Sequence, residues 1–173
     1  MSQCHHLLQK RREALSYLEE LAMLGPALLV NTGMIEITKK PISPQLVINK
    51  IRSNDSGCIV IYIGLIRGYS RGKPVLSVEY NDAQGAAEAR LGEIASGARQ
   101  KWRLNNVAIC HRIGMLKVGD INLVVAIAAS HRREGFAACR YVIDQFKQKL
   151  PAQKKETYQD GSVWWSAPLA HSG

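Results

Sequence analysis

The residues best suited to chemistry lie between Ser130 and Glu156. His131 and Arg132 stand at the start of a predicted helix, and Lys147 stands near its end. The first turn of a helix presents unpaired N–H groups and a partial positive charge, so an arginine and a histidine there would complete a seat for a phosphate. The segment therefore indicates an anion-binding site, or else a solvated basic helix with a histidine near its cap.

Further basic residues follow this helix and precede it in the chain. Lys154 and Lys155 come after a proline-containing turn, and Arg67 begins a glycine-containing loop after an apolar run. A lysine amine becomes reactive when burial or neighbouring cations lower its pKa, and loops held by rigid strands often carry binding residues. Arg67 can equally be a surface cation, and the alternative for Lys147 is stabilisation of a helix end.

The length of the predicted helix constrains how these residues can meet. From His131 to Lys147 the helix rises roughly 24 Å, at about 1.5 Å per residue. One small pocket cannot easily contain both ends of a straight helix. We therefore expect a homodimer with a shared pocket, to which one copy contributes His131 and Arg132 and the other contributes Lys147 and Lys154.

Periodicity predicts the elements that position these side chains. Mostly β-branched or alternating runs indicate strands, and apolar residues at helical spacing indicate helices. The expected strands cover residues 34–38, 58–65, 75–80, 106–113 and 121–129, with a C-terminal hairpin at 154–158 and 163–166. The expected helices cover residues 45–52, 83–102 and 131–149, with a further helix at 7–24.

This order of elements predicts an α+β fold, with antiparallel strands, two long helices packed on them and an extra N-terminal helix. Residues 1–30 form the predicted N-terminal helical extension, and residues 31–173 form the predicted main domain. The strands at 106–113 and 121–129 are expected to pair as a hairpin. In the last long helix, the residues expected to face the core are Phe136, Cys139, Val142, Ile143 and Phe146.

The composition favours an acidic partner. The chain has 173 residues, a formal net charge of +9 and 46% hydrophobic residues, enough for a sizeable core. Nucleic acid is not the expected partner, because the basic residues are scattered and aromatic residues make up only 6%. No apolar run reaches about 18 residues and no secretory leader is evident, so we expect a cytoplasmic protein without membrane contact.

The cysteines give little support to a metal or thiol site. Cys58 and Cys110 lie in apolar runs typical of core thiols, and Cys139 lies mid-helix without an evident base. Cys110 and His111 are neighbours on a strand, so their side chains point to opposite faces and cannot meet. Cys4-His5-His6 is more simply a chance cluster near a terminus than a metal site. We expect no metal and no bound cofactor.

Four segments taken together resemble the large, catalytic subunit of molybdopterin synthase. Gly64-Leu-Ile-Arg67 resembles a G-x-V-R pattern that follows a strand. The other three segments are His111-Arg-Ile-Gly114 with Val118-Gly-Asp120, Ser130-His-Arg-Arg-Glu-Gly-Phe136, and Asp144 to Glu156 with its lysines and Pro151. The resemblance covers about residues 34 to 166.

The resemblance implies a sulfurtransferase of molybdenum cofactor biosynthesis. Such an enzyme converts cyclic pyranopterin monophosphate to molybdopterin by forming its dithiolene, with sulfur from the C-terminal Gly-Gly thiocarboxylate of a small ubiquitin-like carrier subunit. The assembly implied is a heterotetramer built around a large-subunit dimer. At the matching positions, Lys147 and Lys154 become the catalytic lysines. The residues implied to bind the substrate are Arg67, His131, Arg132 and Lys155.

The chain departs from the family pattern at several positions. Ala152-Gln153 replaces a bulky apolar–aromatic pair, Gly135 replaces an alanine, and the region around Glu79-Tyr80 is rearranged. These departures allow a second interpretation, a diverged module that binds a phosphate ligand or a protein without catalysis. A third interpretation, nucleic-acid binding, requires tight binding with a steep dependence on salt.

Overall fold

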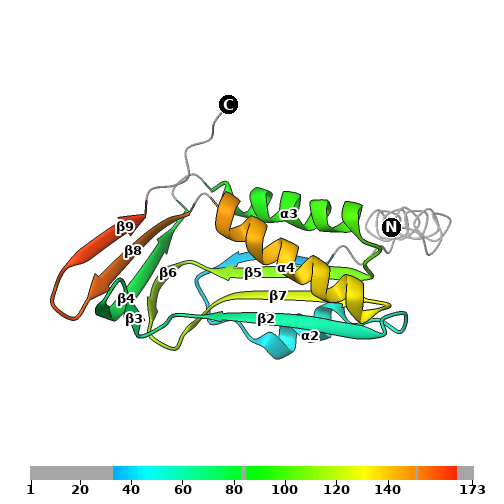
Figure 1. Cartoon of the computed structure of the whole chain (residues 1–173), viewed down its shortest axis with the longest axis horizontal. Helices are drawn as coiled ribbons and strands as arrows, with labels where there is room; N and C mark the ends of the chain where they lie inside the picture. The colour runs from blue at the N-terminus through cyan, green and yellow to red at the C-terminus, as the bar shows by residue number, and fades with distance from the viewer. Residues whose placement is uncertain (1–32, 83–84, 151, 167–173) are drawn as a thin grey trace, which may run out of the picture. The chain divides into compact units, whose positions relative to one another are not determined.

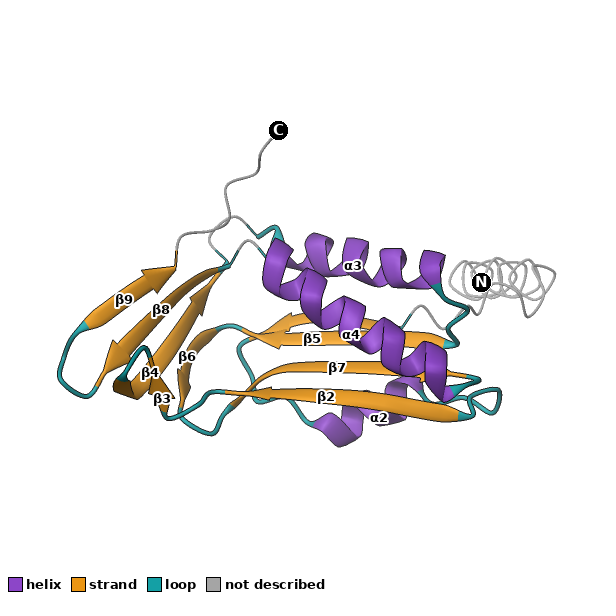
Figure 2. Ribbon diagram, in the orientation of Figure 1, coloured by secondary structure: helices purple, strands orange, loops and turns teal. Residues whose placement is uncertain are grey.

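A computed structural model describes residues 33–82, 85–150 and 152–166 (Figures 1 and 2). The predicted helix at 7–24, the predicted extension 1–30 and Cys4-His5-His6 lie outside these residues. In chain order the elements are β1 (Met34–Thr38), α2 (Pro44–Ile51), β2 (Cys58–Leu65), β3 (Tyr69–Ser70), β4 (Lys73–Asn81), α3 (Ala87–Lys101), β5 (Asn106–Arg112), β6 (Gly114–Lys117), β7 (Ile121–Ala129), α4 (Arg132–Lys149), β8 (Gln153–Tyr158) and β9 (Val163–Ser166).

The first sheet has the strand order β1-β5-β7-β2. β5 and β7 pair antiparallel as the predicted hairpin, and β2 pairs antiparallel with the other side of β7. β1 is the exception to the predicted antiparallel arrangement, because it runs parallel to β5 with Met34 opposite Ala108. The long connection between β1 and β5 allows the chain to return in the same direction.

Helices cover both faces of this sheet. α3 and α4 pack together on one face, and the shorter α2 packs on the other (Figure 1). Alternation along β5 builds both cores, since Val107 and Ile109 face α3 and α4 whereas Ala108 and Cys110 face α2. β7 is covered on both faces in the same way, which explains why it is apolar at nearly every position.

The second sheet has the order β3-β4-β8-β9, with β6 also paired to β4. The chain passes from the first sheet to this one between β2 and β3, again at Ile113 between β5 and β6, and once more through α4, between β7 and β8. Gly114 opens β6 with a φ of 86°, a conformation that favours glycine, so the chain bends here and changes sheets. The sheet has a small core of its own, whose members are Ile66, Val75, Val78, Leu116 and Tyr158.

Most predicted elements occur near their expected bounds, and the α+β class is confirmed. β6 and β3 were not expected, because strands of four and two residues are too short to show a periodicity. α3 begins at Ala87, later than expected. The Asp82 carboxylate accepts hydrogen bonds from the N–H groups of Ala86 and Ala87, both at 3.2 Å. These N–H groups at the start of the helix have no partner within the helix itself.

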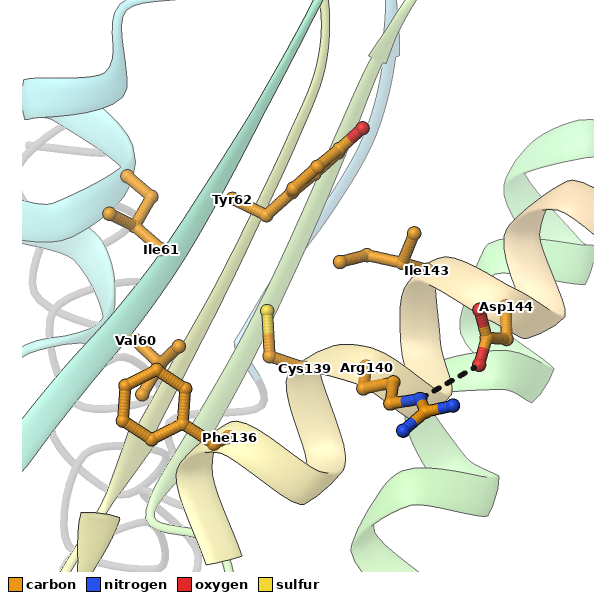
Figure 3. Close-up of a pocket in the computed structure, with 8 residues that line it drawn as sticks. All are labelled: Val60, Ile61, Tyr62, Phe136, Cys139, Arg140, Ile143 and Asp144. Carbon is orange, nitrogen blue, oxygen red and sulfur yellow. Dashed lines mark ion pairs between the residues drawn. The ribbon is translucent and has the colours of Figure 1, made fainter. Parts of the chain in front are cut away.

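The prediction that Phe136 faces the core is wrong. Phe136 is 63% exposed, whereas Cys139, Val142 and Phe146 are buried as expected. β2 is an edge strand, and no other described strand lies beyond it to cover the ring. Phe136 instead lines an apolar surface cavity of about 290 Å³ together with Val60 and other side chains of β2 and α4 (Figure 3).

Candidate active site

The two predicted catalytic lysines line one cavity. It has a volume of about 300 Å³ and lies where the C-terminal end of α4 meets the second sheet. Figure 2 shows this end of α4 beside the start of β8. The lining residues are Tyr80, Phe146, Lys147, Leu150, Ala152, Lys154 and Ser166.

Lys147 reaches the cavity from the last turn of α4. Phe146, the residue before it, is buried against the first sheet. The Lys147 side chain comes next around the helix and therefore projects beside the core. The helix ends at Lys149, where the Leu150 N–H donates to the Phe146 carbonyl at 3.1 Å. Lys147 is exposed at this end, where the helix dipole stabilises a positive charge.

Lys154 reaches the same cavity from β8. It lies directly opposite Tyr80 of β4, and opposite residues of an antiparallel pair share one face of the sheet. Glu156 lies two residues further along β8 and therefore points to the same face. The Lys154 Nζ donates a hydrogen bond to the Glu156 Oε1, so the two side chains form an ion pair on the cavity wall.

Glu156 is held in turn by two hydroxyl groups. It is only 3% exposed, and its Oε2 accepts hydrogen bonds from the Ser70 Oγ at 2.9 Å and the Tyr158 Oη at 2.7 Å. Burial alone would raise the pKa of this carboxyl, but the hydrogen bonds from Lys154, Tyr158 and Ser70 outweigh burial and lower it. Glu156 is therefore charged at neutral pH and fixes the position of the Lys154 ammonium.

Tyr80 provides an aromatic wall of the cavity. Its hydroxyl oxygen accepts a hydrogen bond from the Asn122 Nδ2 at 3.2 Å, and burial raises the pKa of the phenol. The ring meets the His111 ring edge to face, with centroids 5.0 Å apart, and His111 meets Phe146 in the same way at 5.1 Å. Tyr80, His111 and Phe146 therefore form a chain of edge-to-face rings, of which the outer two line the cavity.

His111 is completely buried behind this wall. Its Nδ1 donates to the Asn122 carbonyl at 2.9 Å, because a carbonyl oxygen can only accept. Burial lowers the pKa of His111 to about 4, so the ring is neutral at pH 7. Cys110 faces the opposite side of the sheet as predicted, and burial raises the pKa of its thiol to about 12, which disfavours a thiolate nucleophile.

Sequence reasoning missed Tyr80, Asn122 and Glu156 as residues of this site. Alternation shows which residues of one strand share a face, but it does not show that β4 pairs with β8. A signal for Glu156 was present, since its spacing of two from Lys154 places both side chains on one face of a strand.

Lys155 lies on the opposite face of β8 from this cavity. Its Nζ is 3.9 Å from the Glu79 Oε2 and 5.2 Å from the centroid of the Trp165 ring. Because successive residues of a strand alternate between faces, Lys154 and Lys155 cannot both enter the same cavity.

The other predicted binding residues also lie outside the cavity lining. His131 is the N-cap of α4 and Arg132 is its first residue, so both lie at the opposite end from Lys147. An α-helix of this length, 18 residues, rises roughly 27 Å at about 1.5 Å per residue. Arg67 is exposed in the link between β2 and β3. One chain therefore brings Lys147 and Lys154 together, but not these three residues with them.

Comparison with known proteins places the chain in a family. The family model described as MoaE protein matches residues 37–149. The chain is 34% identical over 137 residues to a protein of Thermoplasma volcanium named molybdopterin synthase catalytic subunit, and the match covers 79% of this chain and 99% of that protein. This chain belongs to the MoaE family.

Further comparisons agree with this assignment to the MoaE family. A protein of the same name from Nostoc sp. is 42% identical over 130 residues, covering 75% of this chain and 79% of that protein. The solved structure of molybdopterin synthase from Staphylococcus aureus matches with a TM-score of 0.72 and 28% identity, over 77% of this chain and 96% of that chain. A chain in the complex of subunits 1 and 2 of molybdopterin-converting factor from Helicobacter pylori, at 11% identity and a TM-score of 0.62, shares the fold; the match covers 79% of this chain and 92% of that chain.

The remainder of this MoaE-family structure offers fewer sites for chemistry. In residues 33–82, 85–150 and 152–166, no group of three or more His, Cys, Asp or Glu side chains is arranged to hold a metal ion. None of the described helices is long and apolar enough to cross a membrane. The cavity of Figure 3 is lined mostly by apolar side chains, and on one side of it the Arg140 Nε lies 3.7 Å from the Asp144 Oδ2.

Proposed function

We propose that this chain is the catalytic subunit of a molybdopterin synthase. The reaction inserts two sulfur atoms into cyclic pyranopterin monophosphate and gives the dithiolene of molybdopterin, in molybdenum cofactor biosynthesis in the cytoplasm. The observation that carries the proposal is the cavity in which Lys147 and Lys154 stand together, in a chain of the MoaE family.

The surroundings of the two lysines suit different roles in sulfur transfer. Attack by a thiocarboxylate moves negative charge, and cations fixed in advance stabilise such charge most effectively. Lys154 is tied to the buried Glu156 and is suited to this fixed role. Lys147 is exposed at the end of α4, so its amine has the freedom to orient the thiocarboxylate or to transfer a proton.

The substrate's phosphate requires further cations, and we assign these to Arg67, His131 and Arg132. The support from His131 and Arg132 is their place at the start of α4, where the His131 side chain makes no capping hydrogen bond. They lie a helix length from Lys147, so a partner copy must bring its own pair to this cavity. Lys155 stays a predicted substrate-binding residue, although it faces away from the cavity.

The sulfur donor in this proposal is a small ubiquitin-like subunit with a C-terminal Gly-Gly thiocarboxylate. The relatives are named catalytic subunits, and the Helicobacter pylori complex contains a second subunit. Ala152 lines the cavity where the family pattern has a bulky apolar residue. Its small side chain leaves more room there for the incoming tail.

Lys147→Ala tests the proposal directly. The full chain is incubated with thiocarboxylated carrier and cyclic pyranopterin monophosphate, and dithiolene formation is measured. We expect the rate to fall by about 10²- to 10⁴-fold, because the amine at the reacting centre is lost. Lys149→Ala is the matched control, since Lys149 is a lysine of the same exposed last turn that does not line the cavity.

Two results would count against the proposal. Unchanged turnover in Lys147→Ala, with Lys149→Ala also unchanged, would remove the assigned role of Lys147. Binding of carrier and pterin by the unaltered chain without dithiolene formation would favour the non-catalytic module instead. Circular dichroism of both variants checks that the fold is retained.

A further inference from the structure

We propose that Tyr80 is a further ligand-contacting residue, whose phenol O–H donates a hydrogen bond to an anionic oxygen or sulfur atom held near Lys147 and Lys154. The inference rests on the proposed function, because it names a contact within the same cavity. Neither the sequence pattern nor the family resemblance assigned a role to this residue.

The first observation is the position of Tyr80. It lines the cavity together with both lysines, and it lies directly opposite Lys154 across the β4–β8 pair. Side chains at opposite positions of an antiparallel pair have Cβ atoms about 4.5–5.5 Å apart. A ligand in this cavity that contacts Lys154 therefore lies beside the Tyr80 side chain.

The second observation concerns the hydroxyl hydrogen. An amide nitrogen such as the Asn122 Nδ2 can only donate, so in this bond the Tyr80 oxygen accepts and its own proton is not used. Among the described residues the Tyr80 hydroxyl has no acceptor for that proton. Burial raises the pKa of the phenol, so the group stays protonated and remains a donor.

The third observation is that Asn122 is held in place. A Cβ atom on Gly64 would lie 2.8 Å from the Asn122 Oδ1, so the amide packs closely over the glycine. The Asn122 backbone carbonyl accepts a hydrogen bond from the His111 Nδ1, which holds the backbone that carries this amide. Gly64 thus leaves room for Asn122, and Asn122 in turn sets the orientation of the Tyr80 hydroxyl.

The charges around Tyr80 fit an anionic ligand. Lys147 and Lys154 are the cations of the lining, and the Glu156 carboxylate, which pairs with Lys154, is the anion beside them. His111 behind the ring is neutral at pH 7 because burial lowers its pKa. A neutral hydroxyl donor beside two cations strengthens the binding of a negative atom without adding a further buried charge.

Tyr80→Phe is the test, because it removes the hydroxyl and keeps the ring. Turnover of the full chain with thiocarboxylated carrier and cyclic pyranopterin monophosphate is measured at saturating substrate. We expect kcat to fall by about 10- to 100-fold, the effect of one hydrogen bond to a charged group, with an unchanged Kd for a carrier that lacks the thiocarboxylate. Tyr141→Phe is the control, since Tyr141 packs on Trp102 and does not line the cavity.

Asn122→Ala provides a second, independent measurement. If Asn122 acts by orienting Tyr80, the double variant with Tyr80→Phe is no slower than Tyr80→Phe alone. Additive losses, or a Tyr80→Phe enzyme with the kcat and KM of the unaltered chain, would overturn the inference. An unaltered chain with no turnover would refute the proposed function itself, so the two failures are distinguishable.

Discussion

Lys147 and Lys154 line one cavity, but their ammonium groups have different surroundings. Lys154 is bound to a carboxylate that is almost inaccessible to solvent, and that carboxylate is bound to Ser70 and Tyr158. A buried charge is costly unless it is paired and hydrogen-bonded, so Glu156 depends on all three partners. The same bonds that stabilise Glu156 also determine where the lysine points.

Glu156→Gln is expected to lower both stability and turnover. The amide keeps the shape of the side chain but not its charge, so Lys154 loses its ion pair. We expect the free energy of unfolding to fall by about 1–3 kcal/mol. Urea unfolding measures this change. Glu79→Gln is the control, because the half-exposed Glu79–Lys155 pair at 3.9 Å should contribute less than about 1 kcal/mol.

The pH dependence gives this prediction a sign. In the folded chain the pKa of Glu156 lies below its ordinary value of 4.5. Near and below pH 4.5 the unfolded chain therefore binds more protons than the folded chain. The stability contributed by Glu156 is fully present above about pH 5 and is lost as the pH falls through the folded pKa. The difference in stability between the unaltered chain and Glu156→Gln should therefore shrink below about pH 4.5. A difference that grows in acid would contradict the assignment of a charged Glu156.

At the scale of elements, the sequence was informative where a segment is long and regular. β2 and β7 are long apolar runs and α4 has a strong helical periodicity, and all three occur almost where they were expected. β6 could not be expected, because the bend at Gly114 that creates it is a backbone feature that no periodicity reports. The prediction for Phe136 was wrong for another reason. Its helical spacing fits a core position, but β2 is the edge strand of the sheet, so the sheet does not extend far enough to cover the ring.

The candidate site was predictable only in part. Lys147 and Lys154 were predicted from their spacing and the family resemblance, and the structure places both in the lining of one cavity. Tyr80 comes from a strand more than sixty residues earlier, and only the β4–β8 register brings it beside Lys154. Strand pairing between distant parts of the chain depends on the whole fold, so the local spacing of residues does not predict it.

Gly135→Ala tests how tightly α4 packs on β2. Alanine favours a helix over glycine by about 1 kcal/mol, but the new Cβ would lie 3.0 Å from the Val60 Cγ2. Val60 borders the cavity of Figure 3 and has room to shift. We therefore expect a net gain of about 0.5 kcal/mol in the free energy of unfolding, measured in urea.

Gly92→Ala is the matched control for this helix substitution. Gly92 lies within α3, and no atom outside its own helix turn lies within 4 Å of the added Cβ. We expect it to give the full gain of about 1 kcal/mol. A Gly135→Ala chain that is less stable than the unaltered one would show that Val60 cannot move.

At the scale of the whole molecule, the length of α4 is the decisive dimension. His131 and Arg132 lie at one end of the helix, and Lys147 lies at the other. If all three act on one substrate, the protein must work as a dimer whose two cavities each draw residues from both copies. Isologous contacts, in which the same surfaces meet twice, produce two such cavities.

Mixed dimers test this arrangement. His131→Ala and Lys147→Ala chains are each expected to be inactive alone, because every cavity then lacks one residue. In a hybrid of the two, one cavity carries both defects and the other carries none. Random re-association should therefore restore about a quarter of the original turnover. Hybrids that stay inactive would rule out a shared cavity. An unaltered chain that turns over substrate but sediments as a monomer would rule it out as well.

β8 and β9 complete the cavity, since Lys154 and Ser166 line it, and they are the last two strands of the described chain. Protein synthesis proceeds from the N-terminus, and the early parts of a chain fold first. By the time α4 has left the ribosome, the strands and helices of the first sheet are all present, but Lys154 and Glu156 are not. A nascent chain therefore forms its scaffold before its candidate site, and a chain cut short after α4 keeps Lys147 without Lys154, the second lysine of the proposed site.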